Sequence, residues 1–303
     1  MNGERPSSRG NGPAVAAVER HRDMTLFDER SLRRSIDLFI DEDVGRGDIT
    51  TRALIPPELT GSAHIETRQH AIVAGLDAAV LCFDIMGGDI RWECKAADGD
   101  EVNPGDVLAQ IEGPMRSILT AERTALNLVG RLSGVATLTR RFVDAVSGTA
   151  VRLVDTRKTT PGLRLLEKHA VRAGGGYNHR FGLDDGILIK DNHLVAAGGI
   201  TEAVRRLRHV APHGLLVEVE VQDLHGLDEA LAAGAGAVLL DNMSPQLVRD
   251  AVARAGGKTV LEASGGITLD NVRQYADAGV DLISIGALTH SAPAIDVSLE
   301  VHG

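Results

Sequence analysis

A repeated alternation of short apolar runs and amphipathic helical segments after about residue 147 constrains the fold most strongly. Ser244 and Pro245 supply an N-cap and a first-turn proline, Thr268 is a predicted N-cap, and Gly256 and Gly279 mark helix ends. Repeated strand–helix units imply a parallel sheet with right-handed crossovers. The sequence therefore predicts an open, incomplete α/β barrel over residues 134–290. The apolar runs are Val151–Val154, Ile187–Ile189, Leu215–Val221, Ala237–Leu240, Thr259–Leu261 and Leu282–Ile285.

The first half of the chain has a different pattern. Helical spacing begins near Leu32, and short strands dominate between Gly61 and Ile111, with a predicted strand pair in Gly99–Leu108. A helix at Ala78–Met86 interrupts these strands, and a long helix follows Pro114. This mixture of short strands and helices differs from the regular alternation that follows it.

Charge and composition limit the class of protein. The formal net charge of −10 argues against a broad nucleic-acid surface, because phosphate backbones need a basic face. No apolar run approaches the roughly 18–20 residues that cross a bilayer, and Ala14–Val18 is too short for a signal-peptide core. Residues 1–23 are therefore expected to form a flexible tail and the protein to be cytoplasmic, with no membrane partner. Cys82 and Cys94 fit neither a zinc pattern nor a disulfide framework, so both are expected to be buried and reduced.

Basic residues follow the first two apolar runs, where the strands of a barrel would present a site. The first run is followed by Asp155-Thr156-Arg157-Lys158 and the second by Lys190-Asp191-Asn192-His193, while His179 and Arg180 precede the second. A cationic cluster in an acidic protein is costly unless it meets anions. Arginine suits planar carboxylates because its fork binds two oxygens at once. This edge of the barrel is therefore predicted to bind an anionic substrate.

Carboxylates and glycines follow the later runs. Glu218 and Glu220 alternate with valines, so they share one face and are expected to point into the barrel, where buried carboxylates need partners. With Asp241 nearby, they would suit Mg²⁺ or sugar hydroxyls. Ser264-Gly265-Gly266 and Gly286-Ala287 expose backbone N–H groups after neighbouring strands, which favours phosphate.

These motifs together resemble the quinolinate phosphoribosyltransferase family, the carboxylating nicotinate-nucleotide pyrophosphorylases, from about Leu32 to Leu299. Phe181 stands where a leucine would be more usual. The resembling stretches are Glu42–Thr51, Thr120–Asn127, Asp155–Gly162, Gly174–His193, Glu218–Val221, Leu240–Asn242, Ser264–Gly266 and Gly286–His290.

The resemblance implies an N-terminal α/β sandwich domain over residues 24–133 before the open barrel, and it also implies an assembly and a set of site residues. The C-terminal tail, residues 291–303, would return to the N-terminal domain, and an obligate homodimer, which could assemble further, would share its active sites. The quinolinate ligands would be Arg123 from the neighbouring subunit, with Thr156, Arg157, His179, Arg180 and Lys190. Lys158, Glu220 and Asp241 would be the catalytic residues and would bind phosphoribosyl pyrophosphate. The 5′-phosphate would meet Ser264, Gly265, Gly266, Ile285, Gly286, Ala287 and His290.

The implied reaction transfers phosphoribosyl from phosphoribosyl pyrophosphate to quinolinate with decarboxylation, in de novo NAD biosynthesis. The products are nicotinate mononucleotide, pyrophosphate and CO₂. The implied cofactor is Mg²⁺, held mainly through the substrate, with Glu220 and Asp241 as candidate ligands. Positive charge develops on the ribose as pyrophosphate leaves, and carboxylates could stabilise it.

Several alternatives remain open. A related phosphoribosyltransferase of the ModD type, or a non-decarboxylating nicotinate enzyme, would use a different acceptor. A non-enzymatic scaffold on a barrel fold would have no use for inward glutamates. Glu218 is either a ligand or a structural partner inside the barrel, and His290 either caps a helix or contacts phosphate.

Overall fold

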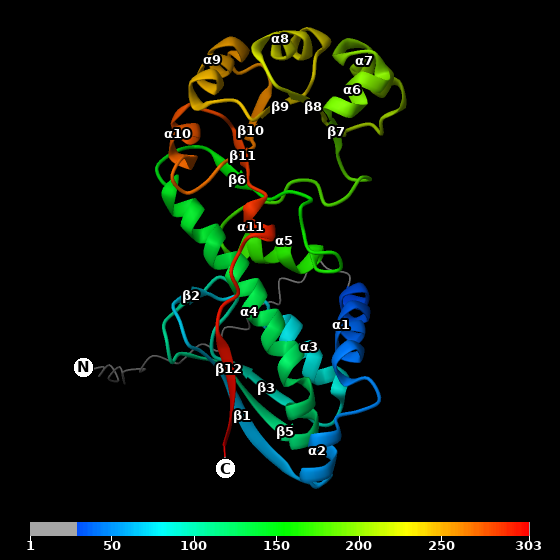
Figure 1. Ribbon diagram of the computed structural model, residues 1–303, viewed down its shortest axis with the longest axis vertical. Helices are drawn as coiled ribbons and strands as arrows, with labels where there is room; N and C mark the ends of the chain where they lie inside the picture. The colour runs from blue at the N-terminus through cyan, green and yellow to red at the C-terminus, as the bar shows by residue number, and fades with distance from the viewer. Residues whose placement is uncertain (1–28, 303) are drawn as a thin grey trace, which may run out of the picture.

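The computed structural model describes residues 29–302 in two parts, a small sheet domain and a larger open barrel (Figure 1). The predicted fold class, an α/β sandwich followed by an incomplete α/β barrel, is confirmed. The predicted tail at residues 1–23 lies outside the described residues. No helix within residues 29–302 combines the length and apolar character that a membrane crossing requires.

The N-terminal part is built on a four-stranded antiparallel sheet in the order β12-β1-β5-β3. The last strand of the chain closes its edge, with Ala63 of β1 opposite Val301 of β12. The helix α4 packs against β1, β5 and β12, and α1 and α3 pack beside it. The helices are α1 (Glu29–Val44), α2 (Ile49–Leu54), α3 (Leu76–Met86) and α4 (Met115–Ala145). The strands are β1 (Thr60–Thr67), β3 (Arg91–Cys94), β5 (Val107–Pro114) and β12 (Val297–His302), with a separate pair β2 (Ala71–Ile72) and β4 (Glu101–Val102).

Three local predictions for this chain are wrong. The strands predicted within Gly99–Leu108 do not pair with each other: β4 pairs with β2, and β5 pairs with β1 and β3. The turn between them bonds instead to Thr67 at the end of β1, through Gly105 N at 2.8 Å. Cys94 is exposed, because it lies on the edge strand β3, whereas Cys82 is buried as expected.

The third wrong prediction concerns Thr268, which does not cap the next helix. That helix, α10, begins after Asn271, whose side-chain oxygen accepts the Thr268 N–H at 2.8 Å. Ser244 does cap its helix, since its hydroxyl accepts the Leu247 N–H, with Pro245 in the first turn.

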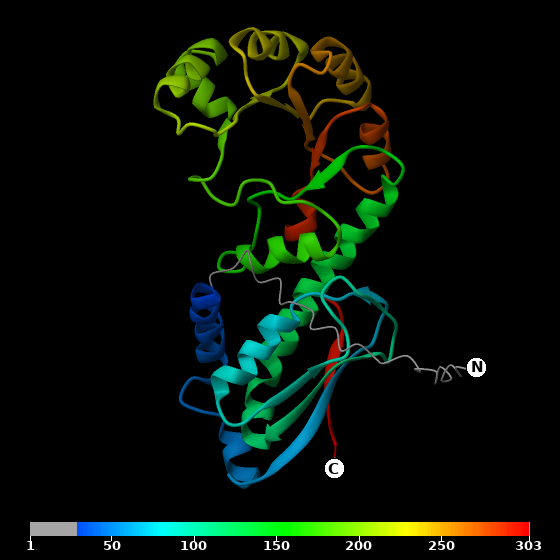
Figure 2. The same cartoon turned by 180° about the vertical axis from the view of Figure 1, so that it is seen from behind.

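The barrel part is a six-stranded parallel sheet in the order β6-β11-β10-β9-β8-β7. Because β6 and β7 are its two edges and do not pair, the sheet curves without closing (Figure 2). The helices α7, α8 and α9 cover its outer side (Figure 1). The strands are β6 (Arg152–Val154), β7 (Ile187–Ile189), β8 (Val217–Val221), β9 (Ala237–Asp241), β10 (Val260–Ser264) and β11 (Leu282–Ser284). The helices are α5 (Arg164–Ala173), α6 (Asp191–Ala197), α7 (Ile200–Val210), α8 (Leu224–Ala233), α9 (Pro245–Ala255), α10 (Val272–Asp277) and α11 (Ala287–His290).

The 31-residue helix α4 joins the two parts, since it packs on the N-terminal sheet and also on α5, α10 and α11. The segment that leads to β12 runs along α4 at two glycines. A side chain at Gly130 would lie 2.7 Å from the Ile295 carbonyl, and one at Gly134 would collide with the Pro293 carbonyl. The Ile295 N–H donates to the Gly130 carbonyl at 2.9 Å. These glycines weaken the helix by roughly 1 kcal/mol each relative to alanine, and they allow the chain to cross it closely.

Candidate active site

The residues predicted to act lie on loops and strand ends at one edge of the barrel sheet. Parallel strands place their carboxyl ends together, which is where barrel enzymes carry their sites. The positions are Asp155 to Thr160 after β6, Lys190 after β7, Glu220 in β8, Asp241 ending β9, Ser264 ending β10 and Gly286 after β11.

The charges of two arginines, Arg157 and Arg180, act on each other at this edge. Burial, and then the nearby charge of Arg157, lower the pKa of Arg180, while Glu218 and Asp185 oppose that shift. Arg180 Nη1 donates to the Gly186 carbonyl at 2.9 Å. Arg157 Nε is buried and has no hydrogen-bond partner within residues 29–302. Two partly desolvated like charges with unused donors form a site that a dianion would stabilise.

Carboxylates gather on the neighbouring strands. Burial, and then the charge of Asp241, raise the pKa of Glu220, and Lys190 opposes the shift. Asp241 accepts a hydrogen bond from the Asn242 side-chain amide at 2.8 Å. Two oxygen-bearing groups beside a lysine fit a hydrated Mg²⁺ or sugar hydroxyls, so these residues could hold the implied cation.

Glycine turns adjoin Lys158. A side chain at Gly286 would lie 3.0 Å from Lys158 Cδ and 3.2 Å from His290 Nε2, so these three residues are neighbours. Gly265 and Gly266 have φ values of +91° and +62°, which glycine adopts readily. The backbone N–H of Ile285 already donates to the Val154 carbonyl at 3.0 Å, so it is used within the sheet.

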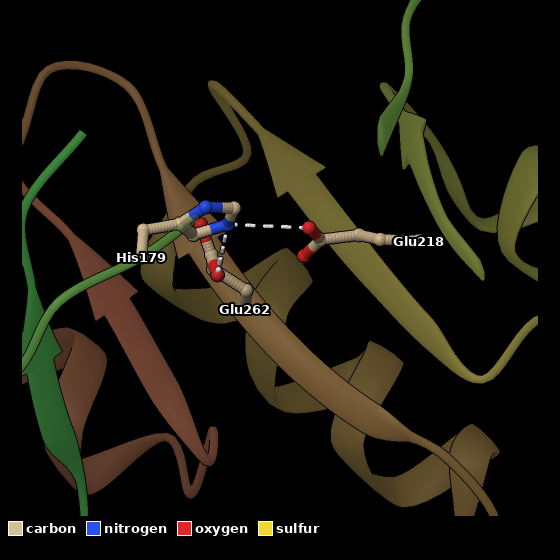
Figure 3. A group of neighbouring side chains, drawn as sticks. All are labelled: His179, Glu218 and Glu262. Carbon is tan, nitrogen blue, oxygen red and sulfur yellow. Dashed lines mark ion pairs between the residues drawn. The ribbon is translucent and has the colours of Figure 1, made fainter. Parts of the chain in front are cut away.

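His179 is turned into the barrel, as Figure 3 shows. Its Nε2 lies 3.2 Å from Glu218 Oε2 and 3.4 Å from Glu262 Oε2. Burial alone lowers the pKa of His179, and the two carboxylates outweigh burial, so the pKa is raised. Burial raises the pKa of Glu218. The three ligand atoms lie within 4.8 Å of one another, a spacing that a metal ion could bridge.

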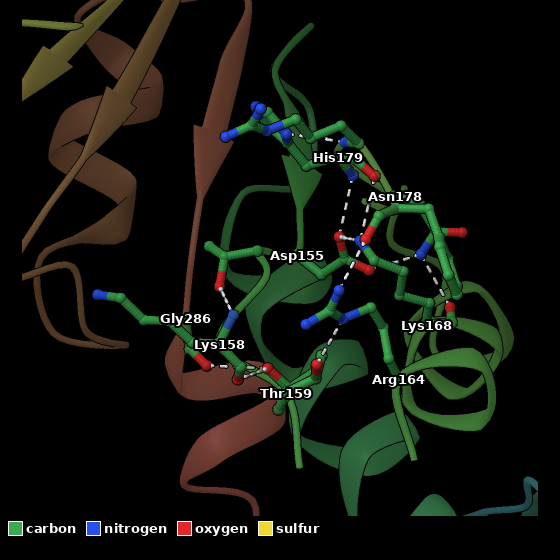
Figure 4. Close-up of polar contacts among 12 residues, drawn as sticks. Asp155, Lys158, Thr159, Arg164, Lys168, Asn178, His179 and Gly286 are labelled. Atoms are coloured by element: carbon green, nitrogen blue, oxygen red, sulfur yellow. Dashed lines mark hydrogen bonds and ion pairs between the residues drawn. The ribbon is translucent and has the colours of Figure 1, made fainter. Parts of the chain in front are cut away.

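A buried carboxylate fixes the loop that carries these residues (Figure 4). Asp155 is fully buried and accepts from Lys168 Nζ, from Asn178 Nδ2 at 2.6 Å and from the His179 N–H at 2.9 Å. Burial raises the pKa of Asp155, and Lys168 is the first of the groups that oppose it. Asp155 therefore ties the Asn178–Arg180 segment to the end of β6.

A second hydrogen-bond network holds the loop that carries Lys158. Arg131 of α4 donates to buried Glu167 at 2.7 Å and to the Thr289 carbonyl. Glu167 in turn accepts from the Thr160 N–H at 3.0 Å, and the Thr289 hydroxyl donates to the Lys158 carbonyl at 2.8 Å. The loop from Lys158 to Thr160 is therefore anchored to both α4 and α5.

The structure leaves Arg123 apart from this group, whereas Lys190 and Thr156 lie at the edge and make local contacts there. Arg123 is 62% exposed at its side chain, its Nη2 lies 3.8 Å from Glu122 Oε1, and it belongs to the first half of α4. Lys190 is exposed and caps α6, where its N–H donates to His193 Nδ1 at 3.0 Å. The Thr156 hydroxyl accepts the Lys158 N–H at 3.0 Å within its own loop.

Sequence reasoning assigned no role to Glu262, Asp155, Lys168 or Glu167. The inward alternation that singled out Glu220 also applies to Glu262, which lies between Leu261 and Ala263, so the signal was present for it. Lys168 and Glu167 carry no such signal, because charged residues on an amphipathic helix usually face solvent.

An open barrel with paired cations, paired carboxylates and glycine turns at its strand ends defines an α/β-barrel enzyme for anionic substrates. The family model described as the quinolinate phosphoribosyl transferase C-terminal domain matches residues 135–300, and that of the N-terminal domain matches residues 48–133. The chain belongs to the quinolinate phosphoribosyl transferase family.

Individual relatives agree with this assignment. The chain is 43% identical over 270 residues to a probable nicotinate-nucleotide pyrophosphorylase (carboxylating) of Bacillus subtilis, covering 89% of this chain and 93% of that protein. It is 44% identical to the Mycobacterium leprae nicotinate-nucleotide pyrophosphorylase (carboxylating), covering 89% and 96%. The solved structure of the Francisella tularensis nicotinate-nucleotide pyrophosphorylase superposes with a TM-score of 0.87 at 40% identity, covering 91% and 98%.

Proposed function

We propose that this protein transfers the phosphoribosyl group of phosphoribosyl pyrophosphate to quinolinate in the cytoplasm, releasing pyrophosphate and CO₂ and forming nicotinate mononucleotide for NAD biosynthesis. The adjacent, partly desolvated guanidinium groups of Arg157 and Arg180 carry the proposal, because a planar dicarboxylate offers each of them a two-oxygen partner. The names of the relatives in Bacillus subtilis and Mycobacterium leprae support the same activity.

The neighbouring groups suit the chemistry of such a transfer. Lys158 beside the Gly286 turn would bind the phosphates, and Glu220 and Asp241 would stabilise the positive charge that develops on the ribose. Mg²⁺, when bound, would neutralise the departing pyrophosphate, with Glu220 and Asp241 as its protein ligands. The quinolinate nitrogen attacks C1 of the ribose as the bond from C1 to pyrophosphate breaks. The bond from C2 of the ring to its carboxylate then breaks to release CO₂, the electron pair stays on C2 beside the positive ring nitrogen, and C2 takes a proton from solvent.

Direct assay with alternative acceptors tests this function. The pure protein, incubated with quinolinate, phosphoribosyl pyrophosphate and Mg²⁺, is expected to release nicotinate mononucleotide, CO₂ and pyrophosphate in equal amounts. Nicotinate is the discriminating control, because it has one carboxylate for the two guanidinium groups. Turnover of nicotinate but not quinolinate would instead indicate the related enzyme with a different acceptor.

The proposed enzyme is a homodimer in which each active site takes residues from both subunits. Arg123 is exposed on the first half of α4, and it would complete the dicarboxylate clamp, Arg157 and Arg180, of a second copy. Mixed Arg123→Ala and Lys190→Ala subunits, each inactive alone, are expected to recover up to about a quarter of wild-type activity. Half of randomly paired dimers are hybrids, and each hybrid has one intact site. Mass spectrometry confirms subunit exchange, and no recovery after confirmed exchange contradicts the shared site.

The raised pKa of Glu220 predicts the acidic limit of activity. The pKa of this carboxyl is raised from its ordinary value of 4.5 by burial and by Asp241. The ionised form is the one that would stabilise the ribose, so kcat/KM for phosphoribosyl pyrophosphate is expected to fall as pH drops toward that raised pKa. The Glu220→Gln variant should have lower activity and lack this acidic limb. The same limb in both proteins would assign it to the substrate phosphates or to another residue.

A further inference from the structure

A buried pair of carboxylates meets one histidine inside the barrel. Glu218 of β8 and Glu262 of β10 flank β9, and both reach the His179 ring (Figure 3). The His179 Nε2 atom lies 3.2 Å from the first carboxylate and 3.4 Å from the second. Glu262 is 1% exposed, and neither of its oxygens has a conventional hydrogen bond within residues 29–302. Burying a carboxylate with so few hydrogen bonds lowers the stability of the fold, so Glu262 is expected to serve another purpose.

The opposite side of the ring contacts the dicarboxylate clamp. His179 Nδ1 accepts the backbone N–H of Arg180 at 2.8 Å. The backbone N–H of His179 donates to Asp155, and the Arg180 guanidinium donates to the Gly186 carbonyl. The ring therefore links the two carboxylates to the main chain of Arg180, and both of its nitrogens are already engaged.

We infer that Glu218 and Glu262 are positioning residues, which hold the His179 ring so that it fixes the backbone of Arg180 for dicarboxylate binding. The inference rests on the proposed function. Contacts to Nε2 from carboxylates on two strands restrain the ring plane, and a ring held in one orientation presents Nδ1 to a single backbone N–H.

Metal binding is the alternative role for this cluster, because His179, Glu218 and Glu262 have the spacing of metal ligands. A metal would need a bare Nε2. Because Nδ1 accepts a hydrogen bond from Arg180, the proton of the neutral ring must lie on Nε2. The adjoining cavity of about 280 Å³, which these three residues line with Arg152 and Tyr177, is large enough for ordered water at the Glu262 oxygens.

The Glu262→Leu variant separates positioning from structural support. Replacing a poorly compensated buried carboxylate by an apolar side chain is expected to leave thermal stability equal or higher. The KM for quinolinate should nonetheless rise about tenfold, with a smaller change in kcat and an unchanged KM for phosphoribosyl pyrophosphate, because supporting contacts of this kind typically affect binding by that order. The Glu262→Gln variant keeps an oxygen that accepts from Nε2–H, so its KM for quinolinate should stay near the wild-type value.

Nitrogen NMR of His179 supplies a readout that does not depend on activity. The wild-type ring is expected to carry a proton on Nε2 throughout the neutral range, and Glu262→Leu, which removes one of the two carboxylates beside that proton, should shift the Nε2 resonance. Three results would overturn the inference: wild-type quinolinate KM in Glu262→Leu, an unchanged Nε2 resonance in that variant, or one equivalent of zinc bound in wild type and lost in Glu262→Leu. A wild-type protein that does not use quinolinate would refute the proposed function, and the NMR comparison would still test the ring contact.

Discussion

Replacing Lys158 by alanine is expected to lower turnover about 10²–10³-fold, the range observed when one charge-stabilising group is removed from a transition state. The lysine side chain is exposed at the edge of the barrel, where its stem packs over Gly286 beside His290. The backbone carbonyl of Lys158 accepts a hydrogen bond from the Thr289 hydroxyl, and this contact holds the loop. Because the substitution leaves that backbone contact in place, the unfolding free energy should change by less than about 0.5 kcal/mol. Steady-state kinetics and thermal unfolding of the same preparation measure both effects.

Two further variants sharpen the test of Lys158. Gly286→Ala keeps the lysine but places a methyl group 3.0 Å from its Cδ, and φ of −64° allows alanine there without strain. It should therefore cause a smaller loss than Lys158→Ala, mainly in the KM for phosphoribosyl pyrophosphate. Lys95→Ala removes a lysine from the N-terminal domain and should leave kinetics unchanged. Normal activity in Lys158→Ala would remove this residue from the site.

The parts of the site that could be predicted depend on regular spacing. Strand–helix alternation determines which residues follow each strand, and parallel strands bring those residues to one edge whatever their separation along the chain. Glu220 and Asp241, from different strands, were predicted together in this way, and the charge of Asp241 does raise the pKa of Glu220. The alternation within β8 likewise predicted that Glu218 and Glu220 share an inward face.

The parts that could not be predicted depend on which charged residues become buried. Glu167 and Lys168 of α5 are 0% and 4% exposed, although adjacent charges on a helix usually indicate a solvated face. Their partners, Arg131 and Asp155, come from α4 and from the end of β6, and no local pattern specifies such pairs. The sheet partners of β4 were missed for the same reason, since pairing between distant strands depends on tertiary structure.

The Asp155→Asn substitution is expected to lower the unfolding free energy by about 3–5 kcal/mol, since it leaves the buried ammonium of Lys168 without its charged partner. Asparagine has nearly the same shape as aspartate, so packing is conserved and the loss reports the charge. Urea unfolding followed by circular dichroism measures it. Arg254→Gln, which breaks an exposed pair with Asp228, is the matched control and should cost at most about 1 kcal/mol.

Removing both charges distinguishes stability from positioning. The double variant Asp155→Asn, Lys168→Met has no unpaired buried ion, so its loss of stability should be smaller than the sum of the two single losses by about 1–3 kcal/mol. Its activity should stay low, because the charged acceptor for the His179 N–H and the Asn178 amide is gone and the segment that carries Arg180 is less restrained. Recovery of quinolinate KM together with stability would show instead that the ion pair serves the fold alone. Additive stability losses would show that Asp155 and Lys168 do not act as a pair.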